Sequence, residues 1–89
     1  MNWEEISFVT GNKIRFRSLL ILKDASHTAT QISKSTGFSV PHVSVALKLL
    51  SSKGLIRCQD VGTRKNKYYS ITEKGIDLIH QLHKVTELI

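Results

Sequence analysis

The chain has 89 residues, of which 40% are hydrophobic and 22% are charged. This size and composition suit a folded protein with one modest core, and they exclude a disordered chain. No apolar run approaches the roughly 20 residues of a membrane-spanning helix, and the opening MNWEEISF lacks the basic region of a secretory signal. The single cysteine, Cys58, excludes an intramolecular disulfide and fits a reducing compartment. We therefore expect a cytoplasmic protein with no membrane partner.

The net charge of +6 is concentrated in the middle of the chain. Residues 28–54 carry three bases and no acid, and residues 55–72 carry four bases against Asp60. The whole excess of positive charge therefore lies within these 45 residues. Neutralisation of phosphates dominates affinity for nucleic acids, so this distribution favours a polyanionic partner. A basic surface that is merely solvated is the alternative.

The first 27 residues predict two helices. Asn2 and Glu5 have the spacing of a capping box for a short helix that ends near Val9. A second helix is expected over residues 13–23. The continuous apolar run of residues 19–22 indicates that it is buried on more than one side.

The next stretch predicts a helix-turn-helix, in which a short helix and a longer one meet at a tight turn. Thr28 and Gln31 form the T-x-x-Q pattern of a capping box at the start of the short helix. Gly37 can adopt the left-handed conformation that ends a helix. Ser39 would cap the longer helix, and Pro41 fits its first turn because the amide hydrogen that proline lacks would be unpaired there.

The helix expected over residues 40–53 has two distinct faces. Its core face repeats apolar residues at helical spacing: Val43, Ala46, Leu47 and Leu50. Its outer face has no acidic residue and consists of Pro41, His42, Ser44, Val45, Lys48 and Ser52. Such a face fits a major groove about 12 Å wide, with His42 and Ser44 near base edges and Lys48 near a phosphate. An ordinary solvated helix is the alternative, although such helices usually carry Glu or Asp.

Residues 55–59 (LIRCQ) and 68–72 (YYSIT) predict the two strands of a hairpin. The segment between them has the composition of a turn, and its tip would carry Thr63, Arg64, Lys65 and Lys67. A basic tip beside a helix-turn-helix can reach a minor groove or phosphates. Turn tips are also often basic simply because they are solvated.

A last helix is expected from Glu73 onward, with Thr72 as its cap. Its apolar residues recur at three-residue steps: Ile76, Ile79, Leu82, Val85 and Leu88. Such a stripe must be buried against the rest of its own domain or against a second copy of the chain.

Two stretches, TATQISKSTGFSVPHVSVALKLLSSKGLIRC and RKNKYYSITEKG, carry a resemblance to a known family. They match the pattern T-P-x-Q-I-A-x-x-T-G, then H-V-S-x-A-L-K-x-L-x-x-K-G-L-I, then R-K-x-x-x-Y-x-I/L-T-x-x-G, over about half of the chain. In this the chain resembles the winged helix-turn-helix transcription regulators, and among them the small archaeal proteins of the MarR/ArsR-like kind. The resemblance implies a fold that is mainly α with a small β-hairpin, in which a three-helix core is followed by a wing and a C-terminal helix.

The resemblance also implies binding of double-stranded DNA by a homodimer. The recognition helix would be residues 40–53 and the wing tip residues 60–67, and the terminal helices would form the dimer interface. Together with the residue patterns, it makes the expected DNA-contacting residues Thr30, Gln31, Ser39, Pro41, His42, Ser44, Val45, Lys48, Thr63, Arg64, Lys65 and Lys67. The expected dimer-interface residues are Trp3, Ile76, Ile79, Leu82, His83 and Leu88.

Three positions depart from the family pattern. Ala29 stands where proline is common at the first helical position, which should change little. Val45 stands where arginine is frequent, so one phosphate or guanine contact is replaced by a side chain that suits a thymine methyl. Leu49 stands where a charge is usual, and we expect it to pack against the first helix or a partner.

A metal-responsive ArsR-like repressor is one alternative, because Asp77, His80, His83 and Glu87 follow one another along the last helix. The cysteine pair that such repressors usually carry in the recognition helix is absent. We therefore interpret these histidines as surface residues, and expect no metal and no other cofactor. The position of Cys58 in a strand predicts a buried structural thiol.

No phosphate-binding glycine loop, G-x-S-x-G or H-E-x-x-H motif is present, so we expect no enzymatic activity. We expect one domain over residues 1–89, with the helix-turn-helix at 28–54, the wing at 55–72 and a dimerisation helix at 73–89. Two functions remain open. The first is a sequence-specific DNA-binding regulator, and the second is a winged-helix module that docks onto another protein in a larger assembly.

Overall fold

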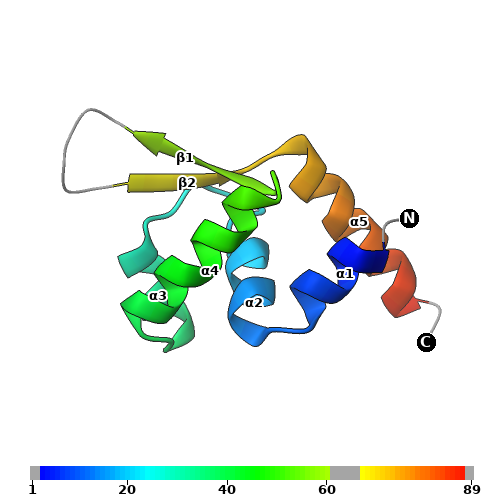
Figure 1. Cartoon of the computed structure of the whole chain (residues 1–89), viewed down its shortest axis with the longest axis horizontal. Helices are drawn as coiled ribbons and strands as arrows, with labels where there is room; N and C mark the ends of the chain where they lie inside the picture. The colour runs from blue at the N-terminus through cyan, green and yellow to red at the C-terminus, as the bar shows by residue number, and fades with distance from the viewer. Residues whose placement is uncertain (1–2, 61–66, 88–89) are drawn as a thin grey trace.

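The computed structural model describes residues 3–60 and 67–87. Within these ranges the chain forms five helices and one antiparallel hairpin (Figure 1). The elements in order are α1 (Trp3–Thr10), α2 (Lys13–Ile21), α3 (Ala29–Thr36), α4 (Val40–Ser52), β1 (Ile56–Asp60), β2 (Lys67–Ile71) and α5 (Glu73–Glu87). The predicted fold class is confirmed. No helix within the described ranges is long and apolar enough to cross a membrane.

The core is built around α4, which packs against α2 and α3 and leads into β1 (Figure 1). The predicted core face of α4 is confirmed, because Val43, Ala46, Leu47 and Leu50 are all buried. Ile32 of α3 and Leu19 of α2 are buried in the same cluster. Because one face of α4 is buried in this core, its opposite face is free to contact solvent or a partner.

The helix-turn-helix signals in the sequence are largely confirmed. Thr28 and Gln31 form the capping box: Gln31 N–H donates to Thr28 Oγ1 at 3.1 Å, and Thr28 N–H donates to Gln31 Oε1 at 3.0 Å. Gly37 ends α3 with a φ of 83°, in the left-handed region. Pro41 lies in the first turn of α4. These features depend on neighbouring residues alone, which is why the sequence predicted them.

The second helix departs from prediction in its end and in its cap. The expected cap of the first helix, Asn2, lies outside the described residues and stays a prediction. The helix expected over 13–23 ends at Ile21, and Asn12 is its unpredicted N-cap. Asn12 Oδ1 accepts hydrogen bonds from the amides of Ile14 at 2.9 Å and Arg15 at 3.1 Å.

The hairpin is shifted by one residue from the predicted strands, since β1 begins at Ile56 and β2 ends at Ile71. Leu55 instead donates its amide to Leu50, and Thr72 caps α5 by accepting the Gly75 amide at 3.2 Å. A further pairing was not foreseen. His27 and Tyr69 exchange both main-chain hydrogen bonds, at 3.1 and 2.9 Å, so the segment before α3 lies along the outer edge of β2.

The apolar stripe predicted for α5 at three-residue steps is buried within this chain only in part. Leu78, Ile79 and Leu82 are buried, whereas Ile76 is 39% exposed. A helix has 3.6 residues per turn, so steps of three rotate steadily away from one face, while positions 78, 79 and 82 stay together. The side chain of Val85 and the whole of Leu88 lie outside what the structure describes.

Candidate nucleic-acid interface

The outer face of α4 is open to solvent. Pro41, His42, Ser44, Val45, Lys48 and Ser52 are all exposed, and Val45 has 58% of its surface accessible. The sequence has no Asp or Glu between Asp24 and Asp60, so no carboxylate comes from α3, α4 or the turn between them. The predicted acid-free face is therefore present and accessible.

A hollow lies between α4 and β2, lined by Ser44, Val45, Lys48, Lys67 and Tyr69. We call it the helix–hairpin hollow. Its two lysines and two hydroxyl side chains come from elements that are far apart in the sequence, and none of the five residues is acidic. Ammonium and hydroxyl groups are the usual side-chain partners of phosphate oxygens. Four of the five residues were predicted as DNA contacts, and Tyr69 was missed.

Tyr69 enters the hollow because strand residues alternate between two faces, which sets it on the same face of β2 as Lys67. Burial raises the pKa of its phenol above the ordinary value of 10.0, and the charge and hydrogen bond of the neighbouring Cys58 raise it further. The phenol is therefore neutral at pH 7 and presents a hydroxyl rather than a repelling negative charge. The two-residue step from Lys67 was the signal in the sequence that could have identified it.

Cys58 is exposed, and its predicted role as a buried structural thiol is wrong. It pairs with Tyr69 across the hairpin and lies two residues beyond the buried Ile56. In Figure 1 the two strands run above α3 and α4. The burial of β1 thus ends before Cys58, although strand alternation places Cys58 on the same face as Ile56.

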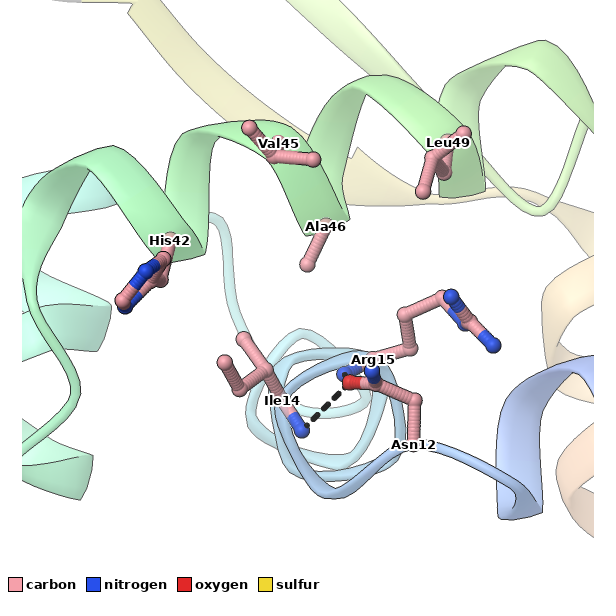
Figure 2. A pocket seen from close by; sticks show the side chains of 7 residues that line it. All are labelled: Asn12, Ile14, Arg15, His42, Val45, Ala46 and Leu49. Carbon is pink, nitrogen blue, oxygen red and sulfur yellow. Dashed lines mark hydrogen bonds between the residues drawn. The ribbon is translucent and has the colours of Figure 1, made fainter.

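A second hollow, the helix–helix pocket, lies on the other side of α4, against the start of α2 (Figure 2). Its lining residues are Asn12, Ile14, Arg15, His42, Val45, Ala46 and Leu49. The departure at Leu49 thus adds an apolar wall to this pocket, where the side chain is 39% exposed. Arg15 lines the pocket, but its charged end is engaged with Phe8. Its Nε donates to the carbonyl of Phe8 at 2.7 Å, and its guanidinium lies 4.2 Å from the Phe8 ring centroid.

Comparison with known proteins identifies the family of this chain. A family model described as winged helix-turn-helix matches residues 10–89. The chain belongs to the winged helix-turn-helix family. A search of curated proteins finds no significant match.

Several solved structures share this winged helix-turn-helix fold. A mutant of ZitR from Lactococcus lactis superposes with a TM-score of 0.75 at 22% identity, over 85% of this chain and 53% of that one. A homodimeric winged helix-turn-helix DNA-binding domain from Mycobacterium bovis, described as a possible ArsR-family regulator, gives 0.72 at 24% identity over 92% and 74%. A protein from Enterococcus faecalis assigned to the MarR family of transcriptional regulators gives 0.83 at 13% identity over 96% and 79%. The winged helix-turn-helix chain described here thus spans about half the length of the Lactococcus protein.

The remaining predicted DNA contacts of this winged helix-turn-helix chain are less tightly grouped. Thr30 is exposed on α3, and Gln31 is exposed but uses its side-chain oxygen in the capping box. Ser39 occupies the predicted N-cap position of α4, but its side chain makes no capping hydrogen bond and contacts His42 instead. Three predicted contacts lie outside the described residues: Thr63, Arg64 and Lys65.

The predicted dimer-interface residues divide into two groups. Trp3 on α1 is 61% exposed, and Ile76 and His83 on α5 are also exposed. Ile79 and Leu82 are buried among the core residues of the same chain, and Leu88 lies outside the described residues. Because α1 packs against α5 at the end of the molecule farthest from the projecting hairpin, the exposed group occupies a surface separate from the helix–hairpin hollow (Figure 1).

The predicted histidines of α5 do not form a metal site with their neighbours. Asp77, His80 and His83 are exposed. Across residues 3–60 and 67–87, no group of three or more His, Cys, Asp or Glu side chains is arranged to hold a metal ion.

Proposed function

We propose that this chain is a transcriptional regulator that binds double-stranded DNA, with α4 in the major groove and the wing on the adjacent minor groove or phosphates. The observation that carries the proposal is the helix–hairpin hollow. Lys48 and Lys67 reach it from two elements, Ser44 and Tyr69 add hydroxyls, and no residue from 25 to 59 is acidic. This chemistry suits a phosphodiester backbone better than the surface of another protein, whose binding sites are usually rich in exposed aromatic residues.

The positions of the side chains suggest which of them contact bases and which contact phosphates. His42 and Ser44 lie in the N-terminal half of α4, the part of a recognition helix that approaches base edges. Lys48 and Lys67 would each neutralise a phosphate as the strand leaves the groove. Val45 lies on α4 between Ser44 and Lys48, lines the same hollow, and offers methyl groups that suit the C5-methyl of thymine.

We further propose that two copies bind a palindromic operator whose half-sites lie about one helical turn, or roughly 34–36 Å, apart. The Mycobacterium bovis domain of the same fold is described as homodimeric. In the present chain, exposed Trp3 and Ile76 offer apolar surface on α1 and α5, and apolar surface of this kind is commonly buried by a second copy. Sedimentation should give twice the chain mass of 10.0 kDa. A particle with the mass of a single chain at all concentrations would contradict the dimer.

The experiment that tests DNA binding is a salt titration. A labelled pool of random-sequence duplexes is titrated with wild type, Lys48→Ala/Lys67→Ala and the matched surface control Lys84→Ala, between about 50 and 200 mM salt. We expect the double variant to bind roughly 10- to 100-fold more weakly, and its slope of log affinity against log salt to flatten by about two, one for each lost phosphate contact. Lys84→Ala should behave as wild type.

A protein-docking module predicts a different result. Wild type would then show no duplex binding even at the lowest salt, or the double variant would retain both the affinity and the slope of wild type. Either outcome would overturn the proposed function.

A further inference from the structure

Ser39 and His42 form an unusual pair at the start of α4. Ser39 occupies the N-cap position with an extended backbone, φ −69° and ψ 149°, yet its side chain makes no capping hydrogen bond. Its Oγ lies 2.8 Å from Nδ1 of His42, one helical turn along, and both residues are exposed. A residue type that usually binds helix amides is therefore engaged with a side chain on the proposed DNA-facing surface.

The direction of this hydrogen bond determines what His42 can present to a ligand. The start of a helix carries a partial positive charge, which favours the Ser39 oxygen lone pairs facing the helix and its hydrogen pointing outward to the ring. Nδ1 of His42 then accepts, and in the neutral imidazole the hydrogen must be carried by Nε2. The ring is left with a single N–H donor at its far end.

The surroundings of His42 do not offer a competing charge. From α2, Asn12 and Arg15 line the same pocket, and the Arg15 guanidinium is turned toward Phe8 and away from the histidine (Figure 2). None of the residues lining this pocket is acidic. Within the part of the chain that the structure describes, the ring is hydrogen-bonded to Ser39.

We propose that His42 is a specificity-determining residue that donates from Nε2 to guanine in the major groove, and that Ser39 is a positioning residue that fixes its ring and tautomer. Guanine is the one base that presents two acceptors, N7 and O6, on its major-groove edge. A single donor therefore finds a partner there even if the ring shifts slightly, whereas adenine places an amino donor beside its N7. This inference rests on the proposed DNA binding and adds which base is selected and by which atom.

The first arm of the test uses the free protein. Nitrogen-15 NMR of the His42 ring at neutral pH should show hydrogen on Nε2 in wild type and in Ser39→Thr, which keeps the hydroxyl. Ser39→Ala should show a mixture of the two tautomers. A wild-type ring with its hydrogen on Nδ1, or a Ser39→Ala ring identical to wild type, would overturn the positioning role whether or not the protein binds DNA.

The second arm measures base preference. Wild type selects sequences from a random duplex pool, and every base pair of the winning duplex is then replaced in turn. We expect wild type to prefer guanine at one position of each half-site by roughly tenfold. His42→Ala and Ser39→Ala should lose that preference at the same position, and Ser39→Thr should retain it. The surface control Lys84→Ala should match wild type at every position.

The outcomes separate the two proposals. If wild type enriches a sequence but His42→Ala keeps every base preference, His42 is not the specificity determinant, and the DNA-binding proposal still stands. If Ser39→Ala keeps the preference that His42→Ala loses, Ser39 is not the positioning residue. If wild type binds no duplex, the proposed function fails, and the role of His42 in DNA recognition fails with it.

Discussion

The two hollows beside α4 share Val45 but differ in chemistry. The helix–hairpin hollow adds Lys67 and Tyr69 from β2 and presents ammonium and hydroxyl groups. The helix–helix pocket adds Ile14 and Leu49 and is largely apolar, and its one cation, Arg15, is held against Phe8. One helix thus faces two environments, and we propose that the polar one holds the DNA backbone. The difference arises from both partners: α4 turns Ser44 and Lys48 to one side and Ala46 and Leu49 to the other, and β2 and α2 add residues of matching polarity.

The proposed difference between the two hollows is tested most directly by placing the same negative charge in each of them. Ser44→Glu puts a carboxylate in the helix–hairpin hollow, and Leu49→Glu puts one in the helix–helix pocket. Both positions are exposed, so neither change should greatly alter stability. Because a carboxylate beside a phosphate is strongly repelled, we expect Ser44→Glu to lower duplex affinity roughly 100-fold and Leu49→Glu only a few-fold. Fluorescence anisotropy at one fixed salt concentration measures both.

Equal losses in the two variants would mean that the hollows are not distinct in DNA binding. A larger loss in Leu49→Glu would move the proposed backbone contact to the α2 side of the helix. Thermal unfolding of both variants serves as the control that the fold is intact.

The helix-turn-helix was predictable from sequence because its signals act between near neighbours. The Thr28–Gln31 box, the left-handed Gly37 and the apolar face of α4 each depend on spacing within one element. Tyr69 could not be placed in the same way. The two-residue step from Lys67 puts Tyr69 on the same face of the strand, but no local pattern shows that this face meets α4. That placement depends on pairing with Cys58 and His27, which lie 11 and 42 residues earlier in the chain.

Cys58 and Ile76 show the opposite failure, in which a local pattern was extended too far. The strand alternation that buries Ile56 was applied to Cys58, but Cys58 is exposed. The three-residue steps of α5 were treated as one face, although the helix rotates past it. In both cases the local pattern is present in the sequence, but the tertiary packing determines which of its residues are buried.

A substitution at Tyr69 tests the helix–hairpin hollow more specifically, with a smaller expected loss of affinity. Tyr69→Phe removes one hydroxyl from the helix–hairpin hollow and should weaken duplex binding about three- to tenfold at pH 7, since a neutral hydroxyl makes a modest hydrogen bond to phosphate. Because the folded pKa lies above the ordinary value of 10.0, the stability that wild type gains from the neutral phenol is complete below that pH. It is lost as the pH rises through the folded pKa.

Denaturant unfolding of wild type and Tyr69→Phe across this alkaline range isolates the effect, because the other titrating groups are common to both proteins. The gap between the two stabilities should shift against wild type only above about pH 10. A gap that changes below neutral pH would contradict the raised pKa of Tyr69, and unchanged DNA affinity in the variant would remove Tyr69 from the interface.

The most direct test of the DNA-binding proposal is an NMR titration of the labelled protein with a duplex selected from a random pool. The amide resonances of Ser44, Val45, Lys48, Lys67 and Tyr69 should shift together as DNA is added. Those of Ile76 and His83 on α5 should not change. Shifts confined to α1 and α5, with none along α4 or β2, would contradict the proposal that the helix–hairpin hollow holds DNA.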